Sequence, residues 1–305
     1  MPDRPRLLEM LRFRTPKGPG FGIQRSFYLS VLAGTAQLPE LMQVATPKGE
    51  DGSVAGFGVP LGTGATKEDL AKPLARGAYA IASPDQKTVV KLLVLCKEEA
   101  GYNPEAFLAT ADALDLDQET RERMLATWSL LQLTFESFDP RVIPAVRFFL
   151  EIADRLAELT NGVVADPISQ AYRLPGQIVS ATSGKDQLQA QDVVTVKARI
   201  DSGKISLFTL GWQKFGLPEI ELNDVPEGKC KVGIHLIMSL NQQILNGTLL
   251  EVGDRVADGP FPLRVGEGGL DQSVWKGVPC LELSPDRGTV EDVLQVWEEK
   301  HCGRR

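Results

Sequence analysis

Two glutamates at alternate positions of one predicted strand, Glu219 and Glu221, have the spacing that most directly suggests chemistry. In an extended strand their side chains leave the same face roughly 7 Å apart. Two carboxylates so placed suit acid–base hydrolysis or a divalent cation. Asp166, which follows a short predicted strand over 162–165, would strengthen a metal site if it lay nearby. The alternatives are a solvated sheet face for the glutamates and a turn start for Asp166-Pro167.

Aromatic residues flank a turn just before these glutamates. Trp212 and Phe215 lie between two predicted strands. Aromatic side chains on loops can anchor a partner protein, but they also often close a core beneath a hairpin. The candidate binding residues are therefore Trp212, Phe215, Glu219, Glu221 and Asp166.

Motifs for nucleophilic catalysis and phosphate binding are missing. No Gly-x-Ser-x-Gly elbow occurs, and the Ser-x-x-Lys spacing of 273–276 lacks the Lys-Thr-Gly motif that accompanies it in known enzymes. The glycine-rich stretch 52–64 has neither a Gly-Lys-Ser/Thr ending nor the third glycine of a dinucleotide fingerprint. We therefore expect a flexible loop there, no catalytic residues and no cofactor.

Histidine and cysteine offer little more. His235 has no carboxylate or cysteine close to it in sequence, so we expect a hydrogen-bonded, partly buried side chain. The four cysteines (Cys96, Cys230, Cys280 and Cys302) are scattered without a Cys-x-x-Cys pair. This spacing predicts reduced, mostly buried thiols and no metal site.

Composition narrows the class of protein. The 305 residues are 43% hydrophobic and 24% charged, which is typical of a globular chain with room for about two domains. The net charge of −7 disfavours nucleic-acid binding. Neither a signal-peptide core nor a run of about 18 apolar residues occurs, so we expect a cytoplasmic protein that does not enter a membrane. The basic N-terminus could contact an anionic partner or remain a solvated arm.

In the first half of the chain, strands alternate with amphipathic helices. Apolar, β-branched runs predict strands over 26–32, 78–83, 88–95, 128–136 and 162–165. Helices are expected over 67–75, from an Asn103 cap and Pro104 to 114, over 119–126 after an Asp117 cap, and after an Asp139 cap and Pro140. The last carries the clearest apolar stripe, and it ends at Asn161-Gly162. Residues 1–86 are the least defined part.

The second half begins after a polar stretch, 179–192, that predicts a linker or surface loop. A hairpin over 193–210, strands over 217–222, 248–256 and 278–283, and helices over 228–246 and from Thr289 follow. The expected domains are therefore 1–178 and 193–305. The expected fold class is α+β, with two mixed sheets covered by amphipathic helices and ferredoxin-like βαβαβ segments.

Two segments resemble uncharacterised bacterial α+β families. The run 148–167 (FFLEIADRLAELTNGVVADP) resembles a helix-then-strand passage of domain-of-unknown-function group 4261. The run 208–225 (FTLGWQKFGLPEIELNDV) resembles a segment of groups 4026 and 2314, although Leu210 stands where those groups are expected to have a histidine. The resemblance implies a bacterial cytoplasmic protein linked to toxin immunity, and no reaction.

Together these patterns favour binding over catalysis. We expect a cytosolic interaction module, immunity-like or an adaptor, whose acidic surface suits a basic protein partner. The alternative is a metal-assisted hydrolase that uses Glu219, Glu221 and Asp166.

Overall fold

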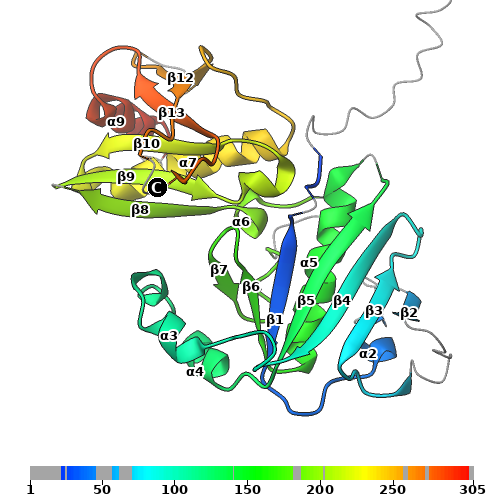
Figure 1. Cartoon of the computed structure of the whole chain (residues 1–305). Helices are drawn as coiled ribbons and strands as arrows, with labels where there is room; N and C mark the ends of the chain where they lie inside the picture. Colours follow the sequence, from blue (N-terminus) through cyan, green and yellow to red (C-terminus); the bar gives the residue numbers. More distant parts are fainter. Residues whose placement is uncertain are drawn as a thin grey trace, which may run out of the picture.

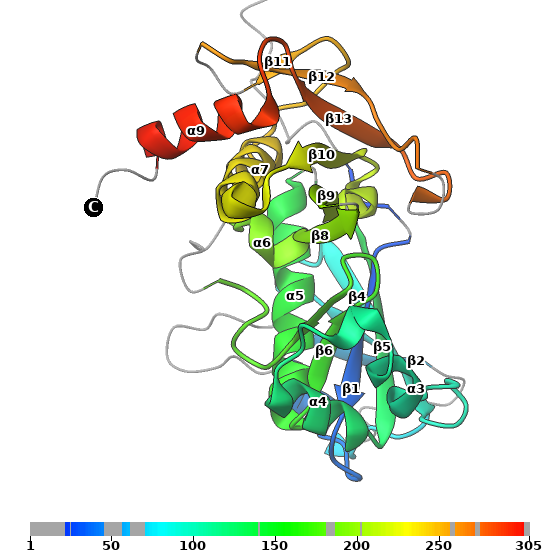
Figure 2. The same ribbon diagram turned by 90° about the vertical axis from the view of Figure 1, so that its left-hand side faces the viewer.

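The computed structural model has two β-sheets in two lobes, the second lying beyond one end of the first (Figures 1 and 2). It describes residues 22–24, 26–45, 57–61, 71–139, 141–180, 187–201, 203–256, 260–271 and 275–301. The α+β fold class is confirmed. In the described residues, no helix combines the length and the apolar character that crossing a bilayer requires.

The first sheet has seven strands in the order β2-β3-β4-β5-β1-β6-β7. All of its described pairings are antiparallel, so the expectation that both sheets are mixed is wrong for this one. The strands are β1 (Tyr28–Ala33), β2 (Phe57–Leu61), β3 (Gly77–Ala82), β4 (Thr88–Cys96), β5 (Ser129–Ser137), β6 (Val163–Asp166) and β7 (Ala171–Arg173). The strand β2 corrects the prediction of a loop throughout 52–64.

Helix α5 (Val142–Leu159) covers one face of this sheet. Its predicted stripe is confirmed, because Val146, Phe149 and Leu156 are fully buried. The strands before and after it, β5 and β6, both pair with β1 and are therefore parallel to each other, which makes β5-α5-β6 a split βαβ unit. The preceding pair, β4 and β5, are antiparallel neighbours, so a full ferredoxin-like βαβαβ order is not formed.

Short helices lie against the opposite face, over β1 and β6. They are α3 (Pro104–Leu108), the 3-10 turn η2 (Ala111–Ala113) and α4 (Gln118–Leu125). Asn103 and Asp117 cap α3 and α4 as predicted, since each side chain accepts a backbone N–H of the first turn. A small apolar cluster around Met124 and Leu32 fixes the segment to the sheet.

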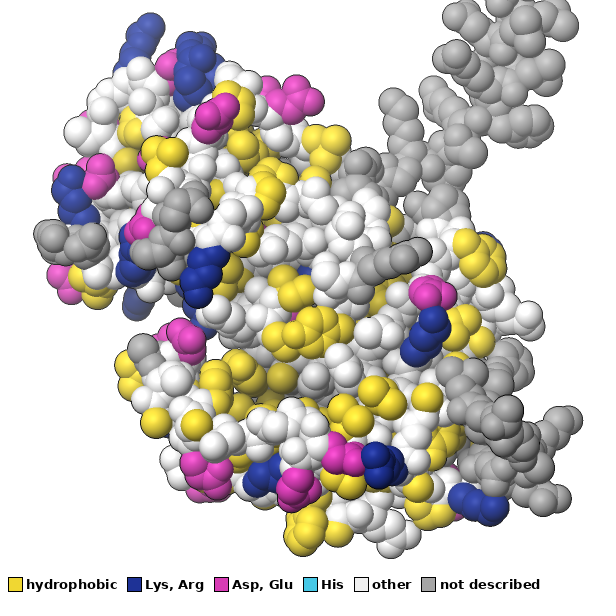
Figure 3. Space-filling model, viewed as in Figure 1, with side chains coloured by type: hydrophobic (Ala, Val, Ile, Leu, Met, Phe, Trp, Pro, Cys, Tyr) yellow, Lys and Arg dark blue, Asp and Glu magenta, His cyan; other side chains and the backbone are white. Residues whose placement is uncertain are grey.

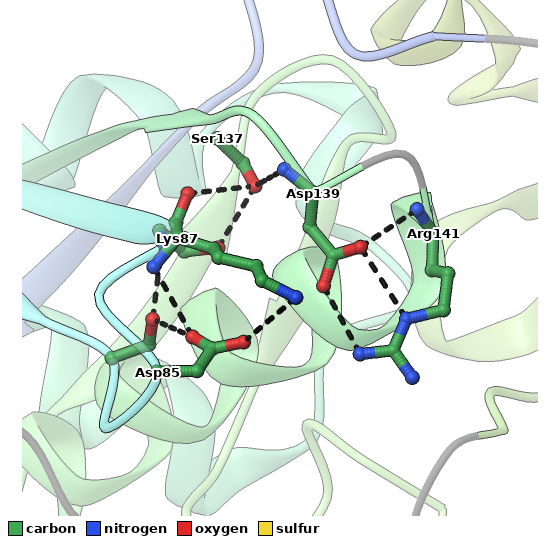
Figure 4. Close-up of polar contacts among 7 residues, drawn as sticks. Asp85, Lys87, Ser137, Asp139 and Arg141 are labelled. Atoms are coloured by element: carbon green, nitrogen blue, oxygen red, sulfur yellow. Dashed lines mark hydrogen bonds and ion pairs between the residues drawn. The ribbon is translucent and has the colours of Figure 1, made fainter.

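A polar network fixes the junction between β5 and α5 (Figure 4). Asp139 Oδ1 accepts the Arg141 N–H at 2.9 Å, and the Arg141 guanidinium donates to both carboxylate oxygens. The Ser137 hydroxyl contacts the Asp139 N–H at 3.1 Å and the carbonyl of Lys87 at 3.2 Å. The N-cap residue of α5 is Arg141 rather than the predicted Asp139. The Asp139 carboxylate accepts the backbone N–H of this cap residue, two positions later in the chain.

The second sheet has six strands in the order β11-β12-β13-β10-β9-β8 and is mixed, because β10 and β13 are parallel. Helices α7 and α9 pack on one of its faces. The elements are α6 (Ala190–Val193), β8 (Thr195–Asp201), β9 (Lys204–Leu210), η3 (Trp212–Phe215), β10 (Glu219–Val225), η4 (Glu227–Lys229), α7 (Cys230–Leu245), β11 (Arg255–Val256), β12 (Leu263–Glu267), β13 (Cys280–Pro285) and α9 (Val290–His301). The structure thus reduces the predicted strand over 248–256 to β11 and adds β12.

One hydrophobic cluster runs through both sheets. Phe27, directly before β1, contacts Phe135 of β5, Phe149 of α5 and Phe215 of η3, with ring centroids 5.3 to 5.8 Å apart. Between the sheets, α6 replaces part of the linker predicted over 179–192. The two halves therefore share a core, although the change of sheet falls where the composition changes.

Other predictions near the N-terminus have mixed outcomes. Short helix α2 (Leu41–Ala45) was not expected, and the described part of the predicted helix over 67–75 is not α-helical. Among the cysteines, Cys280 is buried, Cys230 is partly exposed and Cys96 is exposed, all as free thiols. The expectation of mostly buried thiols is therefore wrong for Cys96, and Cys302 lies outside the described residues.

Candidate functional site

Asp166 lies in a buried polar cluster between the two sheets. Lys214 in η3 places its Nζ 2.5 Å from Asp166 Oδ2 and 2.6 Å from Ser169 Oγ. The Ser169 hydroxyl is in turn 2.8 Å from Asp166 Oδ2 and 3.0 Å from the Val193 carbonyl, either of which accepts its hydrogen. Lys214 and Ser169 are fully buried, and Asp166 is nearly so. Asp166 is thus engaged by an ammonium group rather than by a metal.

The surroundings of Lys214 make it a structural cation. Burial lowers the pKa of its ammonium group, while the Asp166 carboxylate opposes that shift. The ring of Phe27 lies 5.0 Å from Nζ and supports the positive charge. A serine beside a lysine can form a nucleophilic pair, but these two side chains have no exposed surface through which a substrate could reach them. We assign the cluster to holding the two sheets together.

Glu219 is a second structural carboxylate. Its Oε2 accepts from the Thr209 hydroxyl at 2.7 Å, and its Oε1 accepts from the backbone N–H groups of Gly211 and Gln213 at 2.8 and 3.2 Å. Burial raises the pKa of Glu219, and these three hydrogen bonds act against that shift. Gly211 is required here, because its φ is +136° and a Cβ would lie 2.5 Å from the carbonyl oxygen of Val193. Glu219 therefore organises the turn before β10.

Glu221 lies on the same strand but lines a cavity. Its two oxygens accept from the Trp275 indole N–H at 2.7 Å and the Gly269 N–H at 2.8 Å. The cavity has a volume of about 250 Å³. Neither glutamate is on a solvated face, since Glu219 has no exposed surface and Glu221 is only 8% exposed. The solvated alternative is therefore wrong for both.

The three carboxylates do not form a metal centre. Asp166 is held by Lys214, Glu219 by η3 and Glu221 by the loop before β13. Within the described ranges, no group of three or more His, Cys, Asp or Glu side chains is arranged to hold a metal ion.

The aromatic candidates belong to the core. Trp212 is fully buried and donates its indole N–H to Asn241 Oδ1 at 3.0 Å, and Phe215 is 2% exposed. The structure thus shows the packing alternative for both rings. As the side chains lie here, neither one presents a surface to a partner.

His235 is exposed, so the expectation of partial burial is wrong, whereas the expected hydrogen bond is confirmed. Its Nδ1 accepts the Trp297 indole N–H at 3.0 Å. The ring of His301 stacks on the ring of Trp297, with ring centroids 4.0 Å apart. Trp297 and His301 also line a cavity of about 410 Å³ between α7, α9 and the loop before β11. Among the residues that the structure describes, no carboxylate is hydrogen-bonded to His235, so the geometry gives no support for an acid–base role.

A concentrated negative charge lies in the segment 97–123, which we call the acidic segment. It contains eight acidic and three basic residues, a net charge of −5 in a chain whose total is −7. It comprises the turn after β4 together with α3, η2 and α4. All eight carboxylates are exposed: Glu98, Glu99, Glu105, Asp112, Asp115, Asp117, Glu119 and Glu122. This local charge can be counted from the sequence, but the net charge of the whole chain does not show where the acidic residues lie.

The cations of the acidic segment leave most of its negative charge uncompensated. Arg121 donates to the backbone carbonyls of Ala113 and Leu116, and Arg123 pairs with Glu119. Glu98, Glu105, Asp112 and Asp115 form no ion pair with a lysine or arginine in the described part of the chain.

Exposed apolar side chains accompany these acids. Leu114 is 74% exposed and Trp128, directly before β5, is 62% exposed. Leu125 at the end of α4 is 45% exposed. Figure 3 shows acidic and hydrophobic side chains side by side on the lower left lobe, where Figure 1 places α3 and α4. Such mixed surfaces are typical of protein contacts.

Comparison with known proteins adds no relative: no protein family, curated protein or solved structure matches this chain.

Proposed function

We propose that the protein is an interaction module that binds a basic protein partner through the acidic segment and the adjoining Trp128. The observation that carries this proposal is the concentration of a −5 charge in residues 97–123. In line with the families that it resembles, we place this module in the bacterial cytoplasm, as an immunity-like or adaptor protein.

Charge complementarity supports a basic partner. Exposed carboxylates without cationic neighbours create a negative potential that attracts a positive surface and speeds association at low salt. Because these charges lie at the surface, salt screens them within about 10 Å at 0.1 M. The affinity should therefore fall as salt rises.

Trp128 and Leu114 supply the apolar part of the contact. Tryptophan is enriched among residues that contribute most to binding free energy, since one ring removes a large apolar area from water. The acidic side chains around it favour a partner that combines arginines or lysines with an apolar side chain.

The geometry does not support the metal-assisted hydrolase, because its three carboxylates are held by different partners. Binding is thus the function that the geometry supports best.

The test compares two variants that reverse the same number of charges. In E98K/D112K/D115K the acidic segment changes from −5 to +1, whereas E227K/E251K/E299K changes exposed positions elsewhere. Proteins retained from an extract of the source organism are identified, and each is then purified for a measured dissociation constant. We expect a basic partner whose affinity falls at least about tenfold for the first variant and less than about threefold for the second.

Equal affinities of both variants for every purified partner would refute the role of the acidic segment. A partner that binds equally well at low and high salt would contradict the electrostatic argument.

A further inference from the structure

The cavity beside Glu221 lies on the face of the second sheet opposite α7 and α9. Neighbouring strands contribute a row of side chains across it: Phe208 pairs in register with Glu221, and Glu221 pairs in register with Glu282. The loop before β13 closes one side with Trp275. Arg199, Ser206, Asn223, Leu270 and Asp271 complete the lining.

Two of the carboxylates that line this cavity form no ion pair within the described residues. Asp271 is paired with Arg199 at 2.7 Å. Glu221 accepts hydrogen bonds from Trp275 and Gly269, and Glu282 accepts one from Asn223 at 3.1 Å, but all of these donors are neutral. In the described residues, no lysine or arginine forms an ion pair with either glutamate.

Their arrangement is unfavourable without a ligand. Glu221 and Glu282 face each other on adjacent parallel strands, which lie about 4.8 Å apart. Like charges directly opposite each other destabilise a sheet. Glu221 is also only 8% exposed, so water screens this repulsion poorly. A cation in the cavity would relieve it.

The aromatic lining favours a planar cation. Phe208 and Trp275 meet edge to face with centroids 5.6 Å apart, and both line the cavity. A guanidinium group stacks on aromatic rings, donates to carboxylates in pairs and is more weakly hydrated than an ammonium group. A volume of about 250 Å³ is below the usual range for drug-sized ligands, so it suits a single side chain.

We propose that this cavity binds an arginine guanidinium group between Glu221, Glu282 and the two aromatic rings. It rests on the proposed function, because it supplies a second contact for an arginine of the basic partner. The same chemistry also admits free arginine, which the test separates from a peptide-borne side chain.

The test measures binding to the full chain by calorimetry with three probes. They are N-acetyl-arginine amide, its neutral citrulline counterpart and free arginine. We expect the arginine amide to bind saturably with one site, and the citrulline amide to bind at least about tenfold more weakly because it lacks the charge. If the site binds an arginine within a peptide, it should bind the arginine amide more tightly than free arginine, because the glutamates repel the carboxylate of the free amino acid. Tighter binding of free arginine would assign the site to the free amino acid and overturn the link to the partner.

Variants locate the site. E282Q keeps the size of the side chain and should weaken binding of the arginine amide about tenfold, whereas E267Q, an exposed neighbour on β12, should leave it unchanged. Absence of saturable binding to the wild type, equal binding of citrulline amide, or an unaffected E282Q would overturn the proposal. The acidic-segment variant E98K/D112K/D115K should still bind the amide, so failure of the cavity and failure of the proposed function give different results.

Discussion

Replacing Asp166 by alanine tests whether the buried ion pair holds the two sheets together. Asp166 belongs to β6 of the first sheet and Lys214 to the turn before β10 of the second, and both are buried. The substitution leaves an ammonium group in the core beside Ser169 and the Phe27 ring, without the carboxylate that it contacts in the wild type. Either the charge stays without its partner or the lysine becomes neutral.

Both routes give a similar magnitude. Breaking a buried ion pair by removing one partner costs about 3–5 kcal/mol. Making an amine with an ordinary pKa near 10.4 neutral at pH 7 costs about 4.6 kcal/mol, and this is an upper value because burial already lowers the pKa of Lys214. We therefore expect D166A to lose about 3–5 kcal/mol of unfolding free energy at pH 7.

The measurement is urea unfolding followed by both tryptophan fluorescence and far-UV circular dichroism. A matched control is D224N, which breaks the exposed Lys204–Asp224 pair, 2.7 Å apart, and should cost less than about 1 kcal/mol. The double variant D166A/K214M removes both charges and should be at least about 2 kcal/mol more stable than the sum of the two single effects predicts.

If D166A lost no more stability than D224N, or if the double-variant effects were additive, the role assigned to this cluster would be refuted.

Two further predictions concern the other buried carboxylates. E219A should lose at least about 3 kcal/mol, because three buried donors lose their acceptor, whereas E219Q should lose less than about 1 kcal/mol. Because the folded-state pKa of Glu219 is raised above 4.5, the stability of the wild type relative to E219Q should fall as the pH rises through that pKa, and a pH-independent difference would contradict this. D139A should cost about 1–2 kcal/mol at pH 7, since Arg141 loses its acceptor at the start of α5. Burial acts to raise the pKa of Asp139, but the hydrogen bonds from Arg141 outweigh burial, and the pKa is lowered. The cost of D139A should therefore disappear as the pH falls from about 3.9 through the lowered pKa. An unchanged cost in unfolding at pH 2 would refute the assignment.

Local signals in the sequence predicted much of the fold. The Asp117 and Asn103 caps, the stripe of α5 and the β8–β9 hairpin all depend on residues within a few positions of one another. Strand β12 was missed because its five residues, LRVGE, hold only two buried apolar side chains, a pattern too short to stand out. The strand β2 was missed because its glycine-rich surroundings indicate a loop.

The site was less accessible to sequence reasoning because it depends on tertiary contacts. Nothing near Lys214 in sequence shows that its ammonium meets Asp166, 48 positions earlier. Likewise, Trp275 reaches Glu221 across 54 positions. The glutamates were correctly placed on one strand, but the roles of their carboxylates are set by partners from other elements. The resemblance to the bacterial families stays a prediction.

The most direct test of the proposed function uses a defined probe, an unstructured peptide of net charge +5 that contains arginines and one leucine. The dissociation constant is measured at low salt for the wild type and for E98K/D112K/D115K, and hydrogen exchange locates the contact. We predict protection of residues 98–128 in the wild type and a loss of affinity of at least about tenfold in the variant. Equal affinity of the two proteins, or protection confined to other parts of the chain, would contradict the assignment of partner binding to the acidic segment.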